Sequence, residues 1–334
     1  MRIFKRISAL ALGSVLFLAG LLKLMDPVGA GLQMEAYFRF LHIGFLNALA
    51  VPASVAFALF ETVVGAAVLT GFRRKLAGIV SFVLLVFFTV LTFVIWIANP
   101  DMECGCFGEA IHMTHGQSLV KNLVLVALWA AAFLPRGVQE DTPNIKRAAF
   151  WTASVSSVLF LAYSLFSLPL VDFTSLKPGA ELEGETSVAV FDGQGESRDS
   201  LLVNGRVIVI SVYEADKLSS EDWLSISRFA GTVEDSGLRP LLLVSGDPDE
   251  VPANSSLMAD HRALMTLNRS NGGATYVADG QVIKKWPSRS LPEKDDLECA
   301  ASDNPMEALV SSTAPGRLKL QGFLLYVFAV MLLL

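Results

Sequence analysis

Five long apolar runs constrain the fold of this chain more than any other feature of its sequence. A helix that crosses a bilayer needs about 20 mostly apolar residues, within a range of roughly 17–25. The sequence therefore predicts an all-α transmembrane helix bundle, with a four-helix core and one or two further helices. The runs lie at approximately 7–24, 46–70, 76–98, 119–135 and 149–170, and a sixth, short for a span, lies at roughly 318–334.

The first run has a second interpretation. Arg2, Lys5 and Arg6 precede it, and Val28-Gly29-Ala30 is a weak candidate cleavage site, so a signal peptide is an alternative. The apolar run is long for the core of a signal peptide, and we favour a membrane helix.

Positive charges between the runs predict the orientation. Nine lie on one side of five alternating helices and three on the other, and cytoplasmic loops carry the excess. We therefore expect a cytoplasmic N-terminus in a bacterial inner membrane, with the loop 99–118 and residues 171–315 in the periplasm. The nine are Arg2, Lys5, Arg6, Arg73, Arg74, Lys75, Arg136, Lys146 and Arg147, against Lys23, Arg39 and Lys121.

The composition agrees with a membrane protein that carries an acidic outer part. Hydrophobic residues make up 53% and charged residues 17%, whereas soluble chains carry about 25% charge. Residues 171–315 hold a net charge of −12 and the remainder +6. An acidic outer part argues against a nucleic-acid partner, so the expected partners are the lipid bilayer and a periplasmic protein. Three cysteines are too few for a disulfide scaffold.

The sequence pattern of the outer part predicts an α/β domain. Ser219 can cap a helix that runs to about Asp235, and Asp279-Gly280 is a typical hairpin turn. Strand, helix, strand and hairpin is the order of a thioredoxin-like domain, although other small α/β folds share it. Residues 287–316 are polar and are expected to form a linker. The expected strands are Ser187–Phe191, Arg206–Tyr213, Pro240–Ser245, Ala274–Ala278 and Gln281–Trp286.

Cys104-Gly105-Cys106, between the third and fourth runs, is the main candidate for chemistry. Two cysteines in an oxidising compartment suggest thiol–disulfide exchange. Gly105 lets the chain fold tightly, and the strained bridge that results would be easily reduced. A static disulfide clip or two buried free thiols are equally compatible with this spacing.

A metal site is a further alternative. Cys104, Cys106, His112 and His115 form C-x-C-x5-H-x2-H, and zinc or copper accepts such ligands. The two cysteines are closer than in the usual zinc spacing, so we favour a site without metal. The sequence shows no quinone or haem motif and names no cofactor.

The cysteine loop and its flanks resemble the DoxX/MauE group of membrane proteins over residues 1–135. The similar stretches are CGCFGEAI with Thr114, Gln117, Lys121 and Asn122, then Gly20, Lys23, Asp26 and Pro27, and Glu61 with Gly65. The resemblance implies a redox-associated membrane protein, with a redox role for Cys104 and Cys106. MauE-type members are associated with methylamine utilisation, in which the partner dehydrogenase needs several disulfides.

The whole chain resembles Bacteroidetes-type members that add a helix and a periplasmic thioredoxin-like domain. Arg269-Ser270-Asn271, Gly280 and Lys285-Trp286 carry this resemblance. Gly272 stands where the family pattern has proline, and Tyr213–Lys217 occupies the position of a C-x-x-C motif. The domain therefore lacks a dithiol of its own.

These observations predict four segments and leave two hypotheses for the function. The segments are a four-helix domain (1–135), a cytoplasmic linker with a fifth helix (136–170), the thioredoxin-like domain (171–300), and a linker with a terminal helix (301–334). The first hypothesis is a membrane thiol–disulfide or electron relay, with oxidoreductase-like activity. The second is a non-catalytic scaffold whose outer domain binds a partner.

Five further residues are candidates for accessory roles. Glu61 falls near mid-membrane, where a charge is costly, so it should face the bundle and pair, with Lys23 as the expected partner. Asp26 belongs to the motif after the first run. Asn122 is expected to bind neighbouring helices together. Cys299 is a lone outer thiol, expected to be inert or to pair with another chain, and otherwise able to resolve a bond between Cys104 and Cys106.

Overall fold

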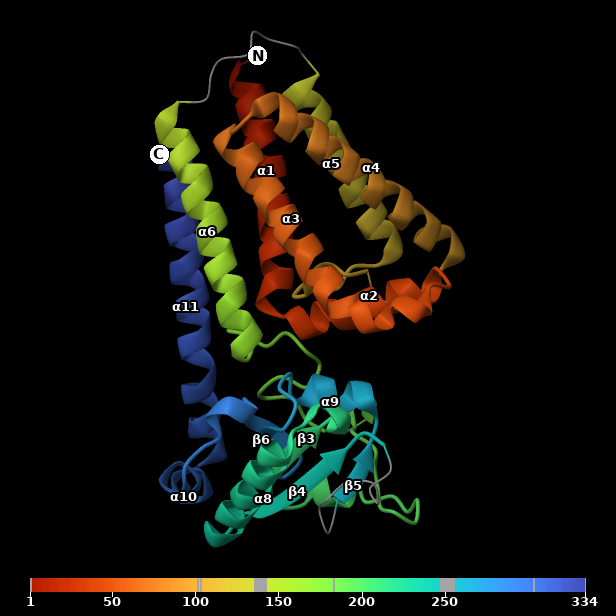
Figure 1. Cartoon of the computed structure of the whole chain (residues 1–334), viewed down its shortest axis with the longest axis vertical. Helices are drawn as coiled ribbons and strands as arrows, with labels where there is room; N and C mark the ends of the chain where they lie inside the picture. Colours follow the sequence, from red (N-terminus) through yellow and green to blue (C-terminus); the bar gives the residue numbers. More distant parts are fainter. Residues whose placement is uncertain are drawn as a thin grey trace. The chain divides into compact units, whose positions relative to one another are not determined.

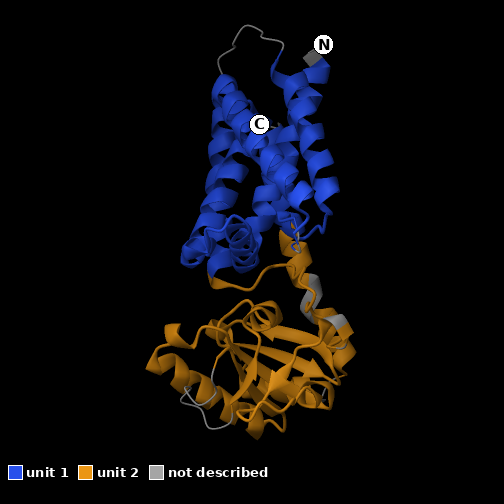
Figure 2. Cartoon of the chain, turned by 90° about the vertical axis from the view of Figure 1, so that its right-hand side faces the viewer, with its two compact units in different colours: residues 1–165, 321–334 blue, residues 166–320 orange. Residues whose placement is uncertain are grey.

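The computed structural model describes residues 2–333 apart from 101, 103, 135–142, 183, 247–255 and 303. The chain forms two compact units (Figure 2). Residues 1–165 and 321–334 form the first, which we call the membrane unit. Residues 166–320 form the second, which we call the α/β unit.

The described residues of the membrane unit form helices and one short strand, which lies in the cysteine loop (Figure 1). Helix α1 packs against α3 and α5, and α4 packs against α3 and α5. The elements are α1 (Arg2–Met25), α2 (Pro27–Phe40), the 3-10 helix η1 (Gly44–Leu49), α3 (Ala50–Thr70), α4 (Arg74–Ala98), β1 (Cys106–Glu109), α5 (His115–Phe133), α6 (Asn144–Phe166) and the end of α11 (Pro305–Leu333).

Five helical segments in the described part of the chain are long and apolar enough to cross a membrane. They correspond to the five expected runs and confirm a multi-pass membrane protein. They are Ile3–Met25, Gly44–Thr70, Arg74–Ala98, His115–Phe133 and Asn144–Phe166. The sixth run lies in α11, which is outside this set, so its spanning stays a prediction. Val28–Ala30, the candidate cleavage site, lie in the first turn of α2.

Glycines allow α1 and α3 to approach closely. A Cβ atom on Gly20 would lie 2.3 Å from Thr62 Oγ1 and 2.6 Å from the Ala58 carbonyl oxygen. A Cβ on Gly65 would lie 2.4 Å from the backbone nitrogen of Phe17. Small residues at such contacts are how helices pack in a bilayer, where apolar burial gives no net attraction between them.

The α/β unit is built on a six-stranded mixed sheet in the order β2-β5-β4-β3-β6-β7. The central strand β3 runs parallel to β4 and antiparallel to β6. The strands are β2 (Val190–Phe191), β3 (Arg206–Val212), β4 (Arg239–Val244), β5 (Ser256–Ala259), β6 (Gly273–Ala278) and β7 (Gln281–Trp286). The helices are α7 (Ser200–Val203), α8 (Ser220–Asp235), α9 (His261–Leu267), α10 (Lys294–Ser302) and the first part of α11, with 3-10 turns η2 (Gly184–Thr186), η3 (Ala215–Lys217) and η5 (Ser288–Ser290).

Local sequence explains the elements that were expected here. Ser219 caps α8 in a capping box with Asp222, which satisfies free backbone N–H groups at the helix start. Asp279 and Gly280 both have positive φ, at 46° and 78°, as a two-residue hairpin turn requires. The strand, helix, strand and hairpin predictions are therefore confirmed, and the unit is α/β.

Three expectations need correction. The first strand is shorter than Ser187–Phe191 and comprises only two residues. Strand β5 and helix α9 were not expected. Residues 287–316 are not an irregular linker, because α10 and the start of α11 lie within them. Although α10 is mostly polar, its Leu297 side chain is fully buried and packs in the core of the α/β unit.

Candidate functional site: a buried cysteine pair

Both candidate cysteines lie in a tight loop that leads into β1. Cys104 and Cys106 are free thiols and both are buried, with 3% and 8% of their surfaces exposed. Strand β1 begins at Cys106 and contacts α1 and α2. The loop is therefore packed into the membrane unit and does not project from it.

Gly105 fixes this loop against α2. Its backbone N–H donates to the phenol oxygen of Tyr37 at 3.2 Å. A Cβ atom at this position would lie 2.1 Å from Oε1 of Gln33, so a larger residue would have to displace that side chain. A larger residue between the two cysteines is therefore accommodated only if the Gln33 side chain moves.

Two side chains of α5 surround Cys104. Ser118 is fully buried, and its hydroxyl makes no hydrogen bond of normal geometry to any described group. Burial raises the pKa of the Cys104 thiol; hydrogen bonding from Ser118 to the thiolate lowers it, Cys106 raises it and Lys121 lowers it. Lys121 also holds its ammonium 5.0 Å from the ring centre of Phe107. A hydroxyl donor, Ser118, and a positive charge, Lys121, therefore both favour the thiolate of Cys104.

Tyr37 stays a phenol beside the pair. Burial raises the pKa of its hydroxyl well above the usual range, and negative charge on Cys106 or Cys104 raises it further. The group can thus donate a hydrogen bond while it accepts one from Gly105. Sequence reasoning missed Tyr37, Gln33 and Ser118, because the first two lie on a helix about 70 residues away and carry no motif.

The histidines of the loop do not complete a metal site here. The two ring nitrogens of His115 lie 3.2 Å from Asn99 Oδ1 and 2.8 Å from the Met102 carbonyl oxygen. Within the described residues, no group of three or more His, Cys, Asp or Glu side chains is placed to hold a metal ion. The four candidate ligands, which include His112, are not brought together.

A buried ion pair joins the first two long helices of the membrane unit. Lys23 Nζ lies 2.6 Å from Glu61 Oε2, and Glu61 is only 3% exposed. The same ammonium lies 5.5 Å from the ring centre of Phe88. The backbone of Lys23 lies close to Gly108, so the helix that carries the lysine contacts the cysteine loop. The expected pairing is present.

Asp26 and Asn122, two further family-motif residues of this unit, make structural contacts. Asp26 caps α2 by accepting a hydrogen bond from the Gly29 N–H at 2.9 Å. The Asn122 amide donates to the Phe88 carbonyl at 3.2 Å and to Thr92 Oγ1 at 3.1 Å, and so ties α5 to α4. These contacts match the packing role expected for Asn122.

Comparison with known proteins identifies the region that holds the cysteine pair. Residues 1–135 match the family model of methylamine utilisation protein MauE. This region is similar to MauE, and we call it the MauE-type region. No curated protein and no solved structure matches the chain. The MauE-type region comprises α1–α5 and the whole cysteine loop, so both expected redox residues and the Lys23–Glu61 pair lie within it.

In contrast to the MauE-type region, the α/β unit has no cysteine in the loop after β3, residues 213–217. The loop after β3 is held by Asn271, which accepts from the N–H groups of Tyr213 and Glu214 at 2.9 and 3.2 Å and donates to the Glu214 carbonyl at 2.8 Å. Gly272 donates its N–H to the Ser211 carbonyl at 2.8 Å and has a φ of 76°. Proline has no N–H and a φ near −65°, so it does not fit there.

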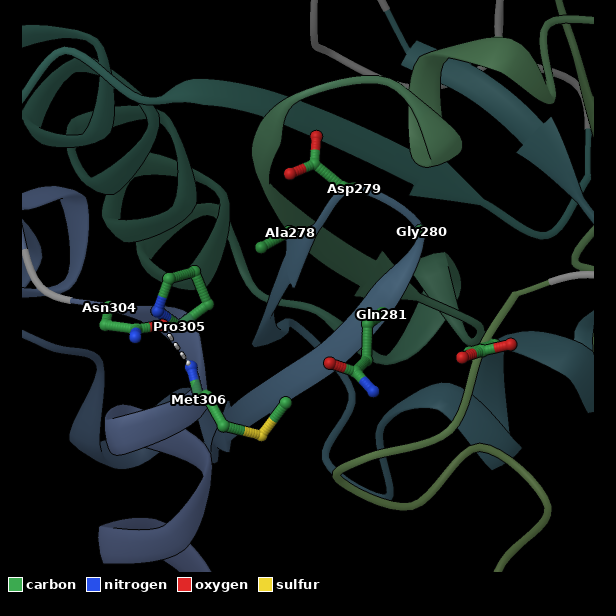
Figure 3. A pocket seen from close by; sticks show the side chains of 8 residues that line it. Ala278, Asp279, Gly280, Gln281, Asn304, Pro305 and Met306 are labelled. Carbon is green, nitrogen blue, oxygen red and sulfur yellow. Dashed lines mark hydrogen bonds between the residues drawn. The ribbon is translucent and has the colours of Figure 1, made fainter.

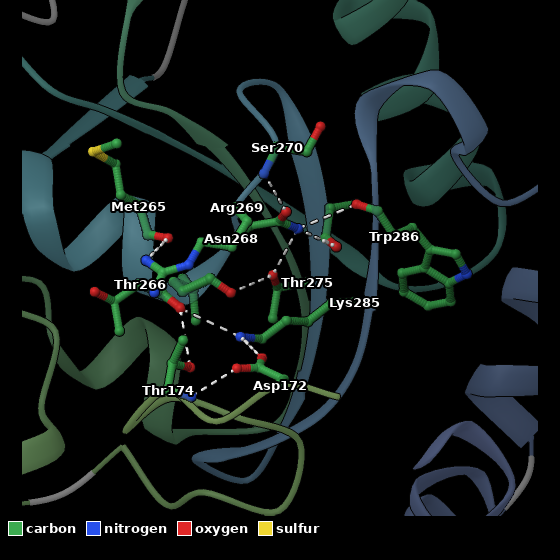
Figure 4. A network of polar contacts seen from close by, with 12 residues as sticks. Asp172, Thr174, Met265, Thr266, Asn268, Arg269, Ser270, Thr275, Lys285 and Trp286 are labelled. Atoms are coloured by element: carbon green, nitrogen blue, oxygen red, sulfur yellow. Dashed lines mark hydrogen bonds and ion pairs between the residues drawn. The ribbon is translucent and has the colours of Figure 1, made fainter. Parts of the chain in front are cut away.

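Four of the residues that carry the longer resemblance, Arg269, Ser270, Lys285 and Trp286, belong to a polar network (Figure 4). Lys285 Nζ lies 2.6 Å from Asp172 Oδ2 and also donates to the Thr266 carbonyl. Asn268 donates to the Ala274 and Trp286 carbonyls. Burial opposes ionisation of Asp172, but the Lys285 charge and hydrogen bonds from Lys285 and Thr174 lower its pKa overall. These residues hold the segment after α6 on the β6–β7 hairpin.

A pocket of about 510 Å³ lies at the hairpin turn (Figure 3). Its lining includes Glu181, Asp279, Asn304 and Met306. The turn lies at the opposite end of the sheet from Gly272, because Ala278 pairs with the first residue of β3 and Gly273 pairs near its end. The pocket therefore does not belong to the loop after β3.

Cys299, the third cysteine, lies on α10 and is exposed. It is part of a helix and not of the irregular tail that was expected. Its setting therefore differs from that of the two buried thiols.

Proposed function

We propose that this protein is a membrane thiol–disulfide relay that works through Cys104 and Cys106. The observation that carries the proposal is the placement of two free thiols, one residue apart, among Tyr37, Ser118 and Lys121 in the MauE-type region. A structural clip needs no thiolate donors around one sulfur, whereas a cycling pair does.

The reaction is a dithiol–disulfide exchange. In the oxidised state a bond joins Cys104 to Cys106, and a partner dithiol gives up two electrons and two protons to reduce it. The partner then carries the disulfide, and the exchange is reversible. The implied membrane is the bacterial inner membrane, with the loop and the α/β unit on the periplasmic side, because the positive charges favour that orientation.

The α/β unit has a different role in this proposal. We infer that it is a thioredoxin-like module that binds the partner without exchanging disulfides. Its sheet order, the helix α8 after β3 and the loop held by Asn271 support this inference. No cysteine lies in the loop 213–217, so the unit should lack disulfide reductase activity when it is tested alone as residues 166–320.

The test compares the redox state and the function of single variants. Cys104→Ser and Cys106→Ser should accumulate like the parent protein, should lose function, and should each capture at most one covalent partner. Alkylation of the parent protein after acid quenching should reveal a population with a Cys104–Cys106 disulfide. Cys299→Ser is the matched control and should behave like the parent.

The competing function is a non-catalytic scaffold. The lack of a dithiol in the α/β unit is the observation that favours it. If both loop variants retain full function and the pair never oxidises in cells, the scaffold is the correct description and the relay is wrong.

A further inference from the structure

The two sulfurs of the cysteine pair lie in different surroundings, which suits them to different roles in disulfide exchange. This inference rests on the proposed relay. Ser118 and Lys121 act on Cys104, the more deeply buried of the two, with 3% exposed against 8% for Cys106. Cys106 begins β1 and leads away from α5.

Ser118 has a hydroxyl that the resting structure does not use. Its side chain is fully buried, and the described residues offer the oxygen no normal hydrogen bond. Leaving a buried polar group unpaired is destabilising, so such a group calls for an explanation. A thiolate on Cys104 would accept a hydrogen bond from this hydroxyl.

Lys121 lies on the same face of α5, three residues after Ser118. Its ammonium lies over the Phe107 ring at 5.0 Å. The titratable groups that face Cys104 in the described structure are Lys121 of α5, Tyr37 of α2 and Cys106 itself. Lys121 is the cation among them.

We propose that Cys106 is the sulfur that exchanges with the partner and that Cys104 is the resolving thiol, with Ser118 and Lys121 as positioning residues for its thiolate. The hydroxyl donates to the developing charge and the ammonium neutralises it. Tyr37 holds the turn through Gly105 and can donate to either sulfur.

The exchange then runs in two balanced steps. A partner thiolate attacks Cys106 Sγ, the Cys104–Cys106 bond breaks, and its electron pair remains on Cys104 as a thiolate. A mixed disulfide now joins Cys106 to the partner. The partner's second thiolate attacks the partner's first sulfur, which is bonded to Cys106, and Cys106 leaves as a thiolate. The partner's two protons end on Cys104 and Cys106, and the partner ends with a disulfide.

The first test uses the full chain and glutathione disulfide as the probe. In a Cys299→Ser background, Cys104→Ser leaves only Cys106, and Cys106→Ser leaves only Cys104. Mass spectrometry should show that Cys106 forms the glutathione adduct several times faster than Cys104 at neutral pH, because Cys104 is the more deeply buried thiol and burial disfavours its reactive thiolate.

The second test follows resolution. With both loop cysteines present, the adduct on Cys106 should be released by Cys104. Ser118→Ala should slow that release about fivefold, the effect of losing about 1 kcal/mol, and should shift the alkylation profile of Cys104 to higher pH. Ser157→Ala is the matched control, because Ser157 is equally buried but bonds within α6.

Lys121→Gln should slow release of the adduct, as Ser118→Ala does, whereas Lys121→Arg should keep the rate of the parent protein. Lys75→Gln, a change at an exposed lysine, is the control. Faster adduct formation at Cys104, or equal behaviour of Ser118→Ala and Ser157→Ala, would overturn the assignment and leave the relay intact. No adduct on either sulfur and no internal disulfide in the folded parent would overturn the relay itself.

Discussion

The membrane unit and the α/β unit each hold one short loop in place with a single side chain, but only one of these loops carries thiols. In the membrane unit, Tyr37 accepts from Gly105 between two cysteines. In the α/β unit, Asn271 bonds three backbone groups of Tyr213 and Glu214, and no cysteine is near in sequence. The comparison teaches that precise loop positioning and redox chemistry are separate properties in this chain.

The two units also differ in how they hold a buried lysine. Lys23 and Lys285 each lie 2.6 Å from a carboxylate oxygen. Lys23 and Glu61 join two candidate spans, whereas Lys285 has Asp172 and a backbone carbonyl as partners. The two units should therefore lose different amounts of stability when one charge of the pair is removed.

The largest effect is expected for Lys23→Met. It leaves the Glu61 carboxylate, 3% exposed, without its counter-charge, and breaking a buried pair in this way costs about 3–5 kcal/mol. Chemical unfolding in detergent should show the loss. Lys75→Met, at an exposed position, is the control. The double change Lys23→Met with Glu61→Leu should recover most of the stability; if it does not, the lysine has another essential contact.

The second prediction sharpens the contrast between the loops. Gly272→Pro should destabilise the α/β unit by about 3 kcal/mol, because it removes the N–H donor to Ser211 and needs a φ of opposite sign. Gly272→Ala keeps the N–H and should cost only about 1–2 kcal/mol for the left-handed backbone. Thermal unfolding of residues 166–320 gives both values. A Pro variant as stable as the parent would mean that this loop readily rearranges to the family form.

The third prediction concerns Asp172. Asp172→Asn should cost the α/β unit about 2 kcal/mol at neutral pH, as expected for a hydrogen bond to a charged group. The pKa of Asp172 is lowered in the folded state, so its contribution is present above the unfolded pKa near 3.8 and disappears as the pH falls through the lower folded value. Unfolding curves of parent and variant should converge in that acidic range.

Much of the framework could be predicted from sequence because its signals are local. The long apolar runs, the Ser219 cap and the Asp279-Gly280 turn each act within a few residues. Strand β5 is only four residues long and α9 seven, so neither has enough periodicity to be recognised. Helix α10 contributes one fully buried residue, Leu297, to the core, and its polar surface gave the wrong expectation of a linker.

The site divides in the same way. Cys104, Cys106 and the Lys23–Glu61 pairing could be predicted from the sequence, because a motif indicates the cysteines and a charge near mid-membrane indicates the pair. Tyr37 and Ser118 have no such signal, since their roles arise from contacts that only the folded bundle creates. The metal alternative also depended on spacing alone, and His115 proved to be engaged by Asn99 and Met102.

The smallest effect is expected for the third cysteine, and it separates the thiols by exposure. Cys299 is exposed on α10, whereas Cys104 and Cys106 are buried. A membrane-impermeant thiol reagent should therefore label Cys299 in native protein faster than either of the loop thiols. In intact spheroplasts the same labelling tests the predicted periplasmic location, and labelling that needs lysis would reverse the orientation.

Cys299→Ala itself should change the free energy of unfolding by less than about 0.5 kcal/mol, as for most surface substitutions. The reason is that an exposed thiol contributes little packing, and the described core of the α/β unit receives α10 through Leu297. Partner capture through the loop cysteines should also be unchanged. If capture instead fails in Cys299→Ala while stability is normal, this thiol resolves the loop disulfide, and the exchange involves both units of the chain.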